Sequence, residues 1–302
     1  MGALGQHHAR VYAQLPDVRL VGVHDVSTAR AEDVAARHLT RAFADVRELA
    51  GEVDAVSVAV PTVDHHRIAL ALLEAGKDVL LEKPMAATLD EADDLIRVAA
   101  ARHVLLQVGH IERFNPAVAV LATHATRPRF IEVHRLASFS PRSLDIDVVL
   151  DLMIHDLDIV LWLDGSDPVQ VDAVGVPVLT SRVDIANARL RFASGLIANL
   201  TASRVSAEKV RKFRVFSSRT YVSLDLATRS AAVHRLVGEE GRPEIAVEKT
   251  AAPDEEPLTR QLAAFVSSVR TRSAPLVSGA DGRRALALAR TILTRMAEPN
   301  RP

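Results

Sequence analysis

Lys83 follows a short apolar run, in a position from which a lysine can act on a bound ligand. Residues 79–81 (Val-Leu-Leu) are too few to form a helix, and Glu82, Lys83 and Pro84 come directly after them. This pattern predicts a buried strand that presents Lys83 at its carboxyl end. In an open α/β sheet, ligands bind in the crevice beyond the carboxyl ends of the strands. The alternative is that Lys83 is an ordinary solvated lysine at a strand end.

A second candidate pair, Asp151 and His155, lies in a predicted helix over residues 147–163. The two are four residues apart, one helical turn, so the carboxylate can hold the imidazole in one tautomer. An imidazole titrates near neutral pH, which suits a general base. The same helix has an apolar stripe, and Asp156 points in a third direction, which leaves little of its surface for solvent. We therefore favour a functional pair over a merely solvated polar face.

Two features near the beginning of the chain are suited to hold a dinucleotide. Gly2-Ala3-Leu4-Gly5 opens a predicted helix and looks like the tail of a Gly-x-Gly-x-x-Gly loop, whose N–H groups suit a pyrophosphate. Asp25 ends the next predicted strand, where a carboxylate accepts hydrogen bonds from the ribose hydroxyls. Its charge repels a 2′-phosphate and favours NAD over NADP, and the nearby Arg30 leaves the alternative open.

Residues 61–65 (Pro-Thr-Val-Asp-His) follow another predicted strand at the same edge of the sheet. We expect Pro61, Thr62 and His65 to line the path of the pyrophosphate and nicotinamide, together with the Glu82–Pro84 segment. The alternative is a helix start capped by Asp64, with exposed histidines.

Residues 1–112 have the pattern of a scaffold that can bring these strand ends together. Predicted strands at 19–25, 41–43, 54–60, 79–81 and 103–108 alternate with helices. Gly76 is expected to end one helix, and Thr88 with Glu91 forms a capping box at the start of the next. Strands separated by helices of this length predict a doubly wound parallel sheet, an α/β Rossmann domain that binds NAD.

Residues 113–302 follow a different pattern and predict an α+β domain for substrate binding and oligomerisation. A strand at 131–139, one helix at 147–163 and several strands between 169 and 247 indicate a large open, mostly antiparallel sheet. Two helices, 257–272 and 280–297, close the chain. Five apolar residues leave more apolar surface than one helix can cover, which predicts a homodimer or homotetramer built through the sheet. They are Leu190, Phe192, Leu196, Ile197 and Leu200.

The composition narrows the class of protein. A chain of 302 residues can bury a large core and form two domains. It has no cysteine, which excludes disulfides and thiolate metal sites and makes a cytoplasmic enzyme the default. A formal net charge of −1 gives no electrostatic reason to expect nucleic acid or an anionic membrane as a partner. No metal site is expected.

Together these residues resemble the Gfo/Idh/MocA oxidoreductases over essentially the whole chain. The resemblance implies an NAD-dependent sugar or polyol dehydrogenase, in which Lys83, Asp151 and His155 are the catalytic residues and the Lys83–Pro84 bond is cis. His155 is our first choice for the general base, with Lys83 relaying the proton; Lys83 is the alternative base. The motifs that carry the resemblance are Gly2-x-x-Gly5-x-x-His8-Ala9, Asp25, Pro61-Thr62 with His65, Glu82-Lys83-Pro84, Gly109-His110, Arg113-Phe114-Asn115-Pro116, Asp151-x-x-x-His155 and Gly279-Ala280-Asp281-Gly282.

The residues around Arg113 and His155 look most like family members that oxidise nucleotide-linked sugars, the UDP-N-acetylglucosamine 3-dehydrogenases among them. Arg113, Asn115 and His155 are then the substrate-binding candidates, because a guanidinium suits bidentate contact with a diphosphate. The alternative role of Arg113 is an interdomain salt bridge. The alternative substrates are free inositols or aldoses, and the family also contains sugar-sensing members without turnover.

The family pattern begins with an apolar strand and a complete Gly-x-Gly-x-x-Gly loop, whereas here Met1 precedes Gly2. We therefore expect the natural protein to begin further upstream, with a strand at the centre of the sheet between the strands at 19–25 and 54–60. The lost hydrogen bonds and buried side chains amount to on the order of 15 kcal/mol, as much as the whole stability of a domain. A GTG valine codon read as a start would explain Met1.

Overall fold

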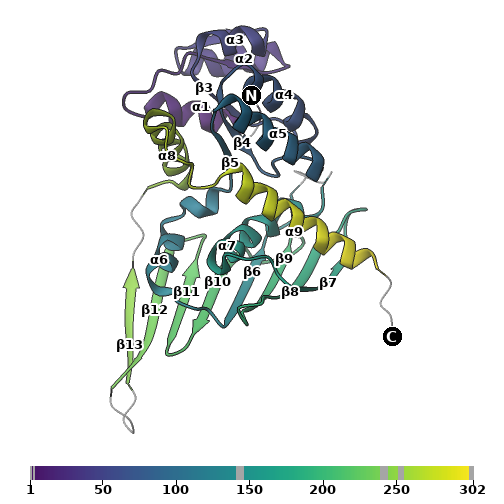
Figure 1. Cartoon of the computed structure of the whole chain (residues 1–302), viewed down its shortest axis with the longest axis vertical. Helices are drawn as coiled ribbons and strands as arrows, with labels where there is room; N and C mark the ends of the chain where they lie inside the picture. The colour runs from purple at the N-terminus through teal and green to yellow at the C-terminus, as the bar shows by residue number, and fades with distance from the viewer. Residues whose placement is uncertain (1, 3, 141–145, 239–243, 251–254, 299–302) are drawn as a thin grey trace. The chain divides into compact units, whose positions relative to one another are not determined.

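The computed structural model describes the chain except residues 1, 3, 141–145, 239–243, 251–254 and 299–302. It divides into two compact units (Figure 1). The first comprises residues 1–111 and 256–283, and the second comprises residues 112–255 and 284–302. None of the described helices is long and apolar enough to cross a membrane.

The first boundary lies within one residue of the expected one, but residues 256–283 return to the first unit. The reason is the apolar face of helix α8 (Pro257–Thr271). Leu258, Leu262 and Phe265 of α8 pack with Val11 and Leu80 in one buried cluster of the first unit. The pattern of α8 shows that it is amphipathic, but not which core it joins.

The strands of the first unit are all parallel, as expected, but they form two sheets. Strands β1 (Gly22–His24) and β2 (Arg41–Phe43) pair with each other, and β3 (Ala55–Val58), β4 (Asp78–Glu82) and β5 (Leu106–Gly109) form the other sheet in that order. The expected single doubly wound sheet is therefore interrupted. Among the described residues no ladder joins β1 to β3.

The other helices of the first unit are α1 (Gly5–Gln14), α2 (Thr28–Arg37), α3 (Val46–Glu52), α4 (Thr62–Glu74) and α5 (Leu89–Arg102). The capping box of Thr88 and Glu91 is confirmed, and Gly76 follows α4 with φ +73°. Helix α3 was not expected, because it has only seven residues. It is started by Asp45, whose side chain accepts a hydrogen bond from the N–H of Arg47.

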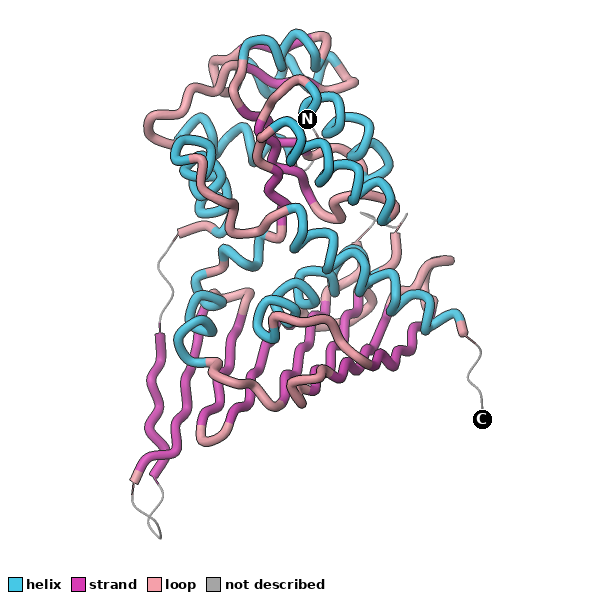
Figure 2. The backbone as a smooth tube through the Cα atoms, viewed as in Figure 1, coloured by secondary structure: helices cyan, strands magenta, loops and turns pink. Residues whose placement is uncertain are grey.

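The second unit is built on one eight-stranded sheet (Figure 2). Its order is β13-β12-β11-β10-β6-β9-β8-β7, and every neighbouring pair is antiparallel except β6 with β9. This confirms the large, mostly antiparallel sheet. The strands are β6 (Phe130–Leu136), β7 (Gln170–Val176), β8 (Ile185–Arg191), β9 (Ile197–Ser203), β10 (Val210–Ser217), β11 (Thr220–Asp225), β12 (Ser230–Val237) and β13 (Glu244–Thr250).

Helices cover one face of this sheet: α6 (Pro116–His124), α7 (Ile154–Asp164) and the later part of α9 (Gly279–Ala297) (Figure 1). A short 3₁₀ helix, η1 (Ile111–Phe114), precedes α6. The helix expected at 147–163 is instead two segments, a π-helix, η2 (Val149–Met153), followed by α7. The N–H of Ile154 donates to the carbonyl of Val149, five residues earlier. Over so short a segment, the spacing of the apolar residues does not distinguish a π-helix from an α-helix.

The prediction that five apolar residues of the sheet leave apolar surface uncovered is wrong for four of them. Leu190, Phe192, Leu196 and Leu200 are at most 2% exposed and lie in the core. Side chains alternate between the faces of a strand, and this set points to the helix-covered face. The opposite face carries an aromatic row instead, formed by Phe130, Phe216, Tyr221 and His234 on adjacent strands.

Candidate functional site

The candidate residues fall into two groups, one in each unit. In the first unit Gly2, Leu4 and Gly5 lie just before or at the start of α1, and the others follow the carboxyl ends of the parallel strands β1, β3 and β4, as the sequence predicts. In the second unit they lie on η1, η2 and α7 and at the start of α6. The first group comprises Gly2, Leu4, Gly5, Asp25, Pro61, Thr62, His65, Glu82, Lys83 and Pro84, and the second comprises Arg113, Asn115, Asp151 and His155; Ala3 lies outside the described residues.

Asp25 comes directly after β1 and is held in place by its neighbours. Its Oδ1 accepts hydrogen bonds from the N–H of Ser27 at 2.8 Å and from Nη2 of Arg30 at 2.8 Å. The Asp25 side chain is 11% exposed, and that of Arg30 is 57% exposed. A fixed carboxylate at a strand end fits the two hydroxyls of a ribose. Arg30 is a second charge at the same place.

Helix α1 begins without a side-chain cap. Its N-cap residue is Leu4, which has no hydrogen-bonding side chain, and Gly5 is the first helical residue. The first N–H groups of a helix need acceptors from outside the helix, and a pyrophosphate supplies them. Helix α4 begins in the same way, with Pro61 at its N-cap and Thr62 as its first residue. Both helix starts fit a bound dinucleotide.

His65 is buried beneath the Lys83 turn and is 1% exposed, so the alternative of exposed histidines is wrong for this residue. Its Nδ1 lies 2.8 Å from the carbonyl oxygen of Pro84, and its Nε2 lies 2.9 Å from that of Val60. Burial lowers the pKa of the imidazole below its ordinary value. The hydrogen bonds to the two carbonyls favour the charged form and oppose this shift, but they do not outweigh it. His65 thus connects the end of β3 to the turn after β4.

Lys83 stands at the carboxyl end of β4, half-buried, and its bond to Pro84 is cis, as the family resemblance implies. All five residues of β4 are buried, which confirms the strand that delivers it. Glu82 turns inward, and its Oε1 lies 3.2 Å from Nε2 of His8. A Cβ at Gly109 would lie 2.6 Å from the same oxygen, so glycine at this position makes room for the Glu82 carboxylate.

Asp151 and His155 lie on either side of the junction between the π-helix η2 and α7. His155 is 9% exposed, and Asp151 is half-buried. Asp156 and Asp158 are almost fully buried, at 1% and 2% exposure. The expectation that this helix has little solvent-facing surface is therefore confirmed. Its polar residues are held inside the unit, where their positions are fixed.

Arg113 and Asn115 are held by contacts within the second unit. Nη1 of Arg113 lies 3.5 Å from Oδ1 of Asp158, and its guanidinium lies 4.5 Å from the ring centroid of Trp162. The alternative of an interdomain salt bridge is wrong for this ion pair, because both partners belong to one unit. Asn115 caps α6 by accepting a hydrogen bond from the N–H of Ala117 at 3.1 Å.

Three residues that the sequence did not mark as site candidates form a buried ionic network beside these residues. Arg135 of β6 donates to both carboxylate oxygens of Asp156 at 2.7 Å and to Oε1 of Glu112 at 2.9 Å. Burial alone would lower the pKa of Arg135, but the two carboxylates raise it above its ordinary value. One feature of the sequence could have indicated this network: Arg135 lies at an inward-facing position of a strand whose residues alternate between buried and exposed. A charge at such a position needs a buried partner.

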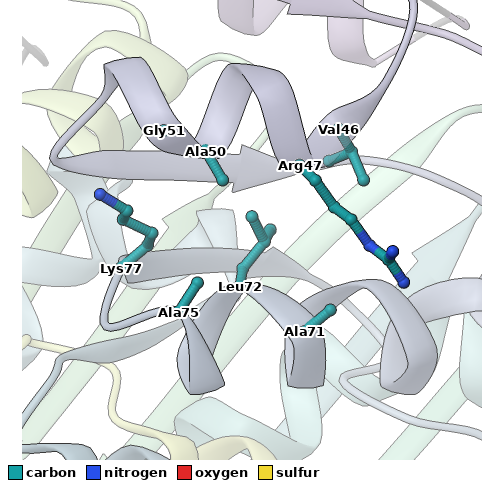
Figure 3. A pocket seen from close by; sticks show the side chains of 8 residues that line it. All are labelled: Val46, Arg47, Ala50, Gly51, Ala71, Leu72, Ala75 and Lys77. Atoms are coloured by element: carbon teal, nitrogen blue, oxygen red, sulfur yellow. The ribbon is translucent and has the colours of Figure 1, made fainter.

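A cavity of about 290 Å³ lies elsewhere in the first unit, between α3 and the end of α4 (Figure 3). Lys77 lies at one end of it and Arg47 at the other. Lys77 precedes β4, whereas Lys83 follows it, so the cavity lies at the amino end of the strand that carries the candidate lysine. It is not part of the candidate site. The described residues contain no group of three or more His, Cys, Asp or Glu placed to hold a metal ion.

Chemically, the first unit offers a carboxylate after β1, two helix starts without a side-chain cap and Lys83 after β4. The second unit offers the carboxylate of Asp151 on η2 and the imidazole of His155 on α7. The profile of an oxidoreductase family with an NAD-binding Rossmann fold, Gfo/Idh/MocA, matches residues 1–110. The profile of the Gfo/Idh/MocA C-terminal domain matches residues 118–223.

Individual proteins resemble the chain over nearly its full length. It is 41% identical to UDP-N-acetylglucosamine 3-dehydrogenase of Acidithiobacillus ferrooxidans over 96% of this chain and 93% of that protein. It is 27% identical to myo-inositol 2-dehydrogenase of Thermotoga maritima over 95% of this chain and 92% of that protein. A solved structure of the A. ferrooxidans enzyme superposes with a TM-score of 0.91 at 39% identity, covering 97% of this chain and 94% of the other.

Proposed function

The chain belongs to the Gfo/Idh/MocA family of NAD-binding oxidoreductases, and from that membership we propose that it oxidises a secondary hydroxyl of a nucleotide-linked sugar. The observation that carries the substrate class is the 41% identity to a UDP-N-acetylglucosamine 3-dehydrogenase over 96% of the chain. The chain also has Lys83, Asp151 and His155, the three candidate catalytic residues, together. A sensing protein without turnover would have no need of the three together.

NAD, when bound, would supply the acceptor for the hydride that leaves the substrate carbon. In our proposal Asp25 holds the adenosine ribose, the starts of α1 and α4 receive the pyrophosphate, and the Glu82–Pro84 turn with His65 shapes the nicotinamide end. Glu82 and His65 contribute by fixing the turn, since both are buried against neighbouring residues. The first unit thus serves the cofactor and the second serves the substrate.

His155 takes the proton of the reacting hydroxyl, and Asp151 orients its imidazole. Lys83 donates a hydrogen bond to the same oxygen and relays the proton; the alternative is that Lys83 is itself the base. Asn115 binds the sugar. Arg113 approaches the diphosphate, for which it must turn from Asp158, its partner in the structure.

The direct test is NADH formation at 340 nm with UDP-sugars, inositols and aldoses as separate substrates. We expect turnover with UDP-N-acetylglucosamine and little with free inositols. Turnover with myo-inositol instead would favour the second candidate, which the relative from T. maritima supports. NADH binding without turnover of any of them would favour a sensing role.

We further propose a cytoplasmic homodimer or homotetramer. The lack of cysteine supports a reducing compartment. The aromatic row on the uncovered face of the second unit supports assembly, because it presents rings side by side across four strands. Their centroids are 5.7 Å apart for Phe130 and Phe216, 4.7 Å for Phe216 and Tyr221, and 5.1 Å for Tyr221 and His234.

A further inference from the structure

Arg135 carries a charge into the core of the second unit. Ile131, Val133 and Arg135 occupy alternate positions of β6, and their side chains all point inward; Arg135 is only 4% exposed. Its Nε and Nη2 donate to the two oxygens of Asp156, each at 2.7 Å. This is a bidentate contact, which fixes the two planar groups in orientation as well as in distance. Asp156 is the residue that follows His155 in α7.

The remaining donor of Arg135 reaches a second carboxylate. Its Nη1 lies 2.9 Å from Oε1 of Glu112, and the other oxygen of Glu112 accepts from Nδ2 of Asn115 at 3.0 Å. Asn115 also donates to the carbonyl of Leu226 at 3.0 Å. Arg211, opposite Arg135 in the sheet, lies 3.9 Å from Glu112. One guanidinium therefore connects the sheet to α7 and to the segment that starts α6.

A buried ion network of this kind adds little net stability, because desolvation offsets the attraction of the charges. What it adds here is geometry. Helix α7 follows the π-helix η2, so the preceding turn does not fix the rotation of α7 about its axis as a regular α-helical turn would. A side chain about 6 Å from a helix axis moves about 2 Å when the helix rotates by about 20°, and a misplacement of about 1 Å can cost about 10²-fold in rate.

We propose that Arg135 is a positioning residue that fixes the rotation of α7, and with it the imidazole of His155, while Glu112 fixes the side chain of Asn115. Arg135 itself touches neither substrate nor cofactor. The inference rests on the proposed role of His155 as the general base.

The test is Arg135→Lys, which keeps the charge but cannot make the bidentate contact. We expect kcat to fall about 10- to 100-fold, the pH profile of kcat to shift, and NADH binding to stay within about twofold of wild type. A role only in stability would lower the midpoint of urea unfolding and reduce activity and NADH binding together, with no change in the pH profile. A kcat within about threefold of wild type would overturn the proposal.

Arg214→Lys is the matched control. Arg214 is on the neighbouring strand β10 and pairs with Glu132 of β6 at 2.8 Å, with the side chain 39% exposed. Its ion pair joins β6 to β10 on the opposite face of the sheet. We expect kcat, the pH profile and NADH binding of this variant to remain at wild-type values. An equal loss of kcat in both variants would contradict a role specific to Arg135.

Two further measurements keep the inference separate from folding and from the identity of the substrate. If Arg135→Lys does not fold, Glu112→Gln decides: KM for the sugar should rise several-fold with the pH profile unchanged, and an unchanged KM overturns the proposal.

If the wild-type protein turns over no sugar, the proposed function fails, and the NMR titration of His155 still tests Arg135. Its resonance, identified by its loss in His155→Asn, should shift its midpoint by about half a pH unit or more in Arg135→Lys. An unshifted midpoint overturns the proposal.

Discussion

His155 is the residue on which the proposed chemistry depends most. Replacing it with asparagine removes the imidazole that we propose as the base and keeps a polar side chain of similar reach. We expect His155→Asn to lower kcat by about 10²–10⁴-fold, because general-base catalysis contributes about that much. NADH binding, measured by fluorescence titration, should change little. His134→Asn, on strand β6, is the control. Near wild-type turnover in His155→Asn would move the role of base to Lys83.

Asp25 and Arg30 form an ion pair after β1, and we expect this pair to set the choice between NAD and NADP. Arg30 donates to Oδ1 of Asp25 through both Nε and Nη2, at 3.2 and 2.8 Å. Asp25→Ala removes the ribose acceptor and the charge that repels a 2′-phosphate, and it releases a guanidinium that suits phosphate. We expect NADH binding to weaken and the preference for NADH over NADPH to narrow about tenfold or more.

The double variant Asp25→Ala/Arg30→Ala separates the two effects. It should bind NADH as weakly as the single variant but lose the improved binding of NADPH, measured by fluorescence titration of each nucleotide. If Asp25→Ala leaves the ratio of the two dissociation constants unchanged, the ribose binds at another place.

At the scale of elements, two helical glycines differ in what surrounds them. Gly282 is buried in the first turn of α9, and a Cβ there would lie 2.6 Å from Cγ2 and 3.0 Å from Cβ of Val108. Val108 belongs to β5 and is fully buried, so it has no room to move aside. A Cβ at Gly51, in α3, would meet nothing within 4 Å.

We therefore expect Gly282→Ala to destabilise the first unit by about 1–3 kcal/mol through overpacking. Gly51→Ala should stabilise it by about 0.5–1 kcal/mol, because alanine loses less backbone entropy in a helix. Urea unfolding of both variants measures the difference. Equal midpoints would mean that α9 does not pack on β5 as tightly as the structure has it.

The same scale separates what can be read from the sequence from what cannot. Strand β4, the Thr88 capping box and the turn at Gly76 were all predictable, because each is encoded within a few neighbouring residues. The π-helix η2 was not, since apolar spacing over one turn does not distinguish it from an α-helix. The partners of α8 were also hidden, because an amphipathic face does not name the core that it joins.

Of the candidate site, the residue types were predictable and their partners were not. Lys83, Asp151 and His155 stand out by spacing within one strand or one helix. The proposed role of Arg135 depends on its contacts with Asp156 and Glu112, which lie 21 and 23 residues away in sequence. Contacts at that separation depend on how the sheet and helices fold together.

At the scale of the whole molecule, the uncovered face of the eight-stranded sheet predicts self-association. The row of Phe130, Phe216, Tyr221 and His234 lies across strands β6, β10, β11 and β12, and clustered aromatic rings are frequent anchors of protein interfaces. We expect a dimer or tetramer at micromolar concentration by light scattering. Tyr221 is the best position to test, because it stacks on rings at both sides.

Tyr221→Glu places a charge in the middle of this row and should weaken association by about 30-fold or more, the cost of a central anchor residue. Tyr221→Phe keeps the ring and should leave the assembly unchanged, which separates loss of the aromatic surface from loss of the hydroxyl. Circular dichroism should confirm that both variants keep their strand content, since Tyr221 is only half-buried in the isolated chain. A wild-type protein that stays monomeric at micromolar concentration, or a Tyr221→Glu variant that associates as strongly as wild type, would place the interface on another surface.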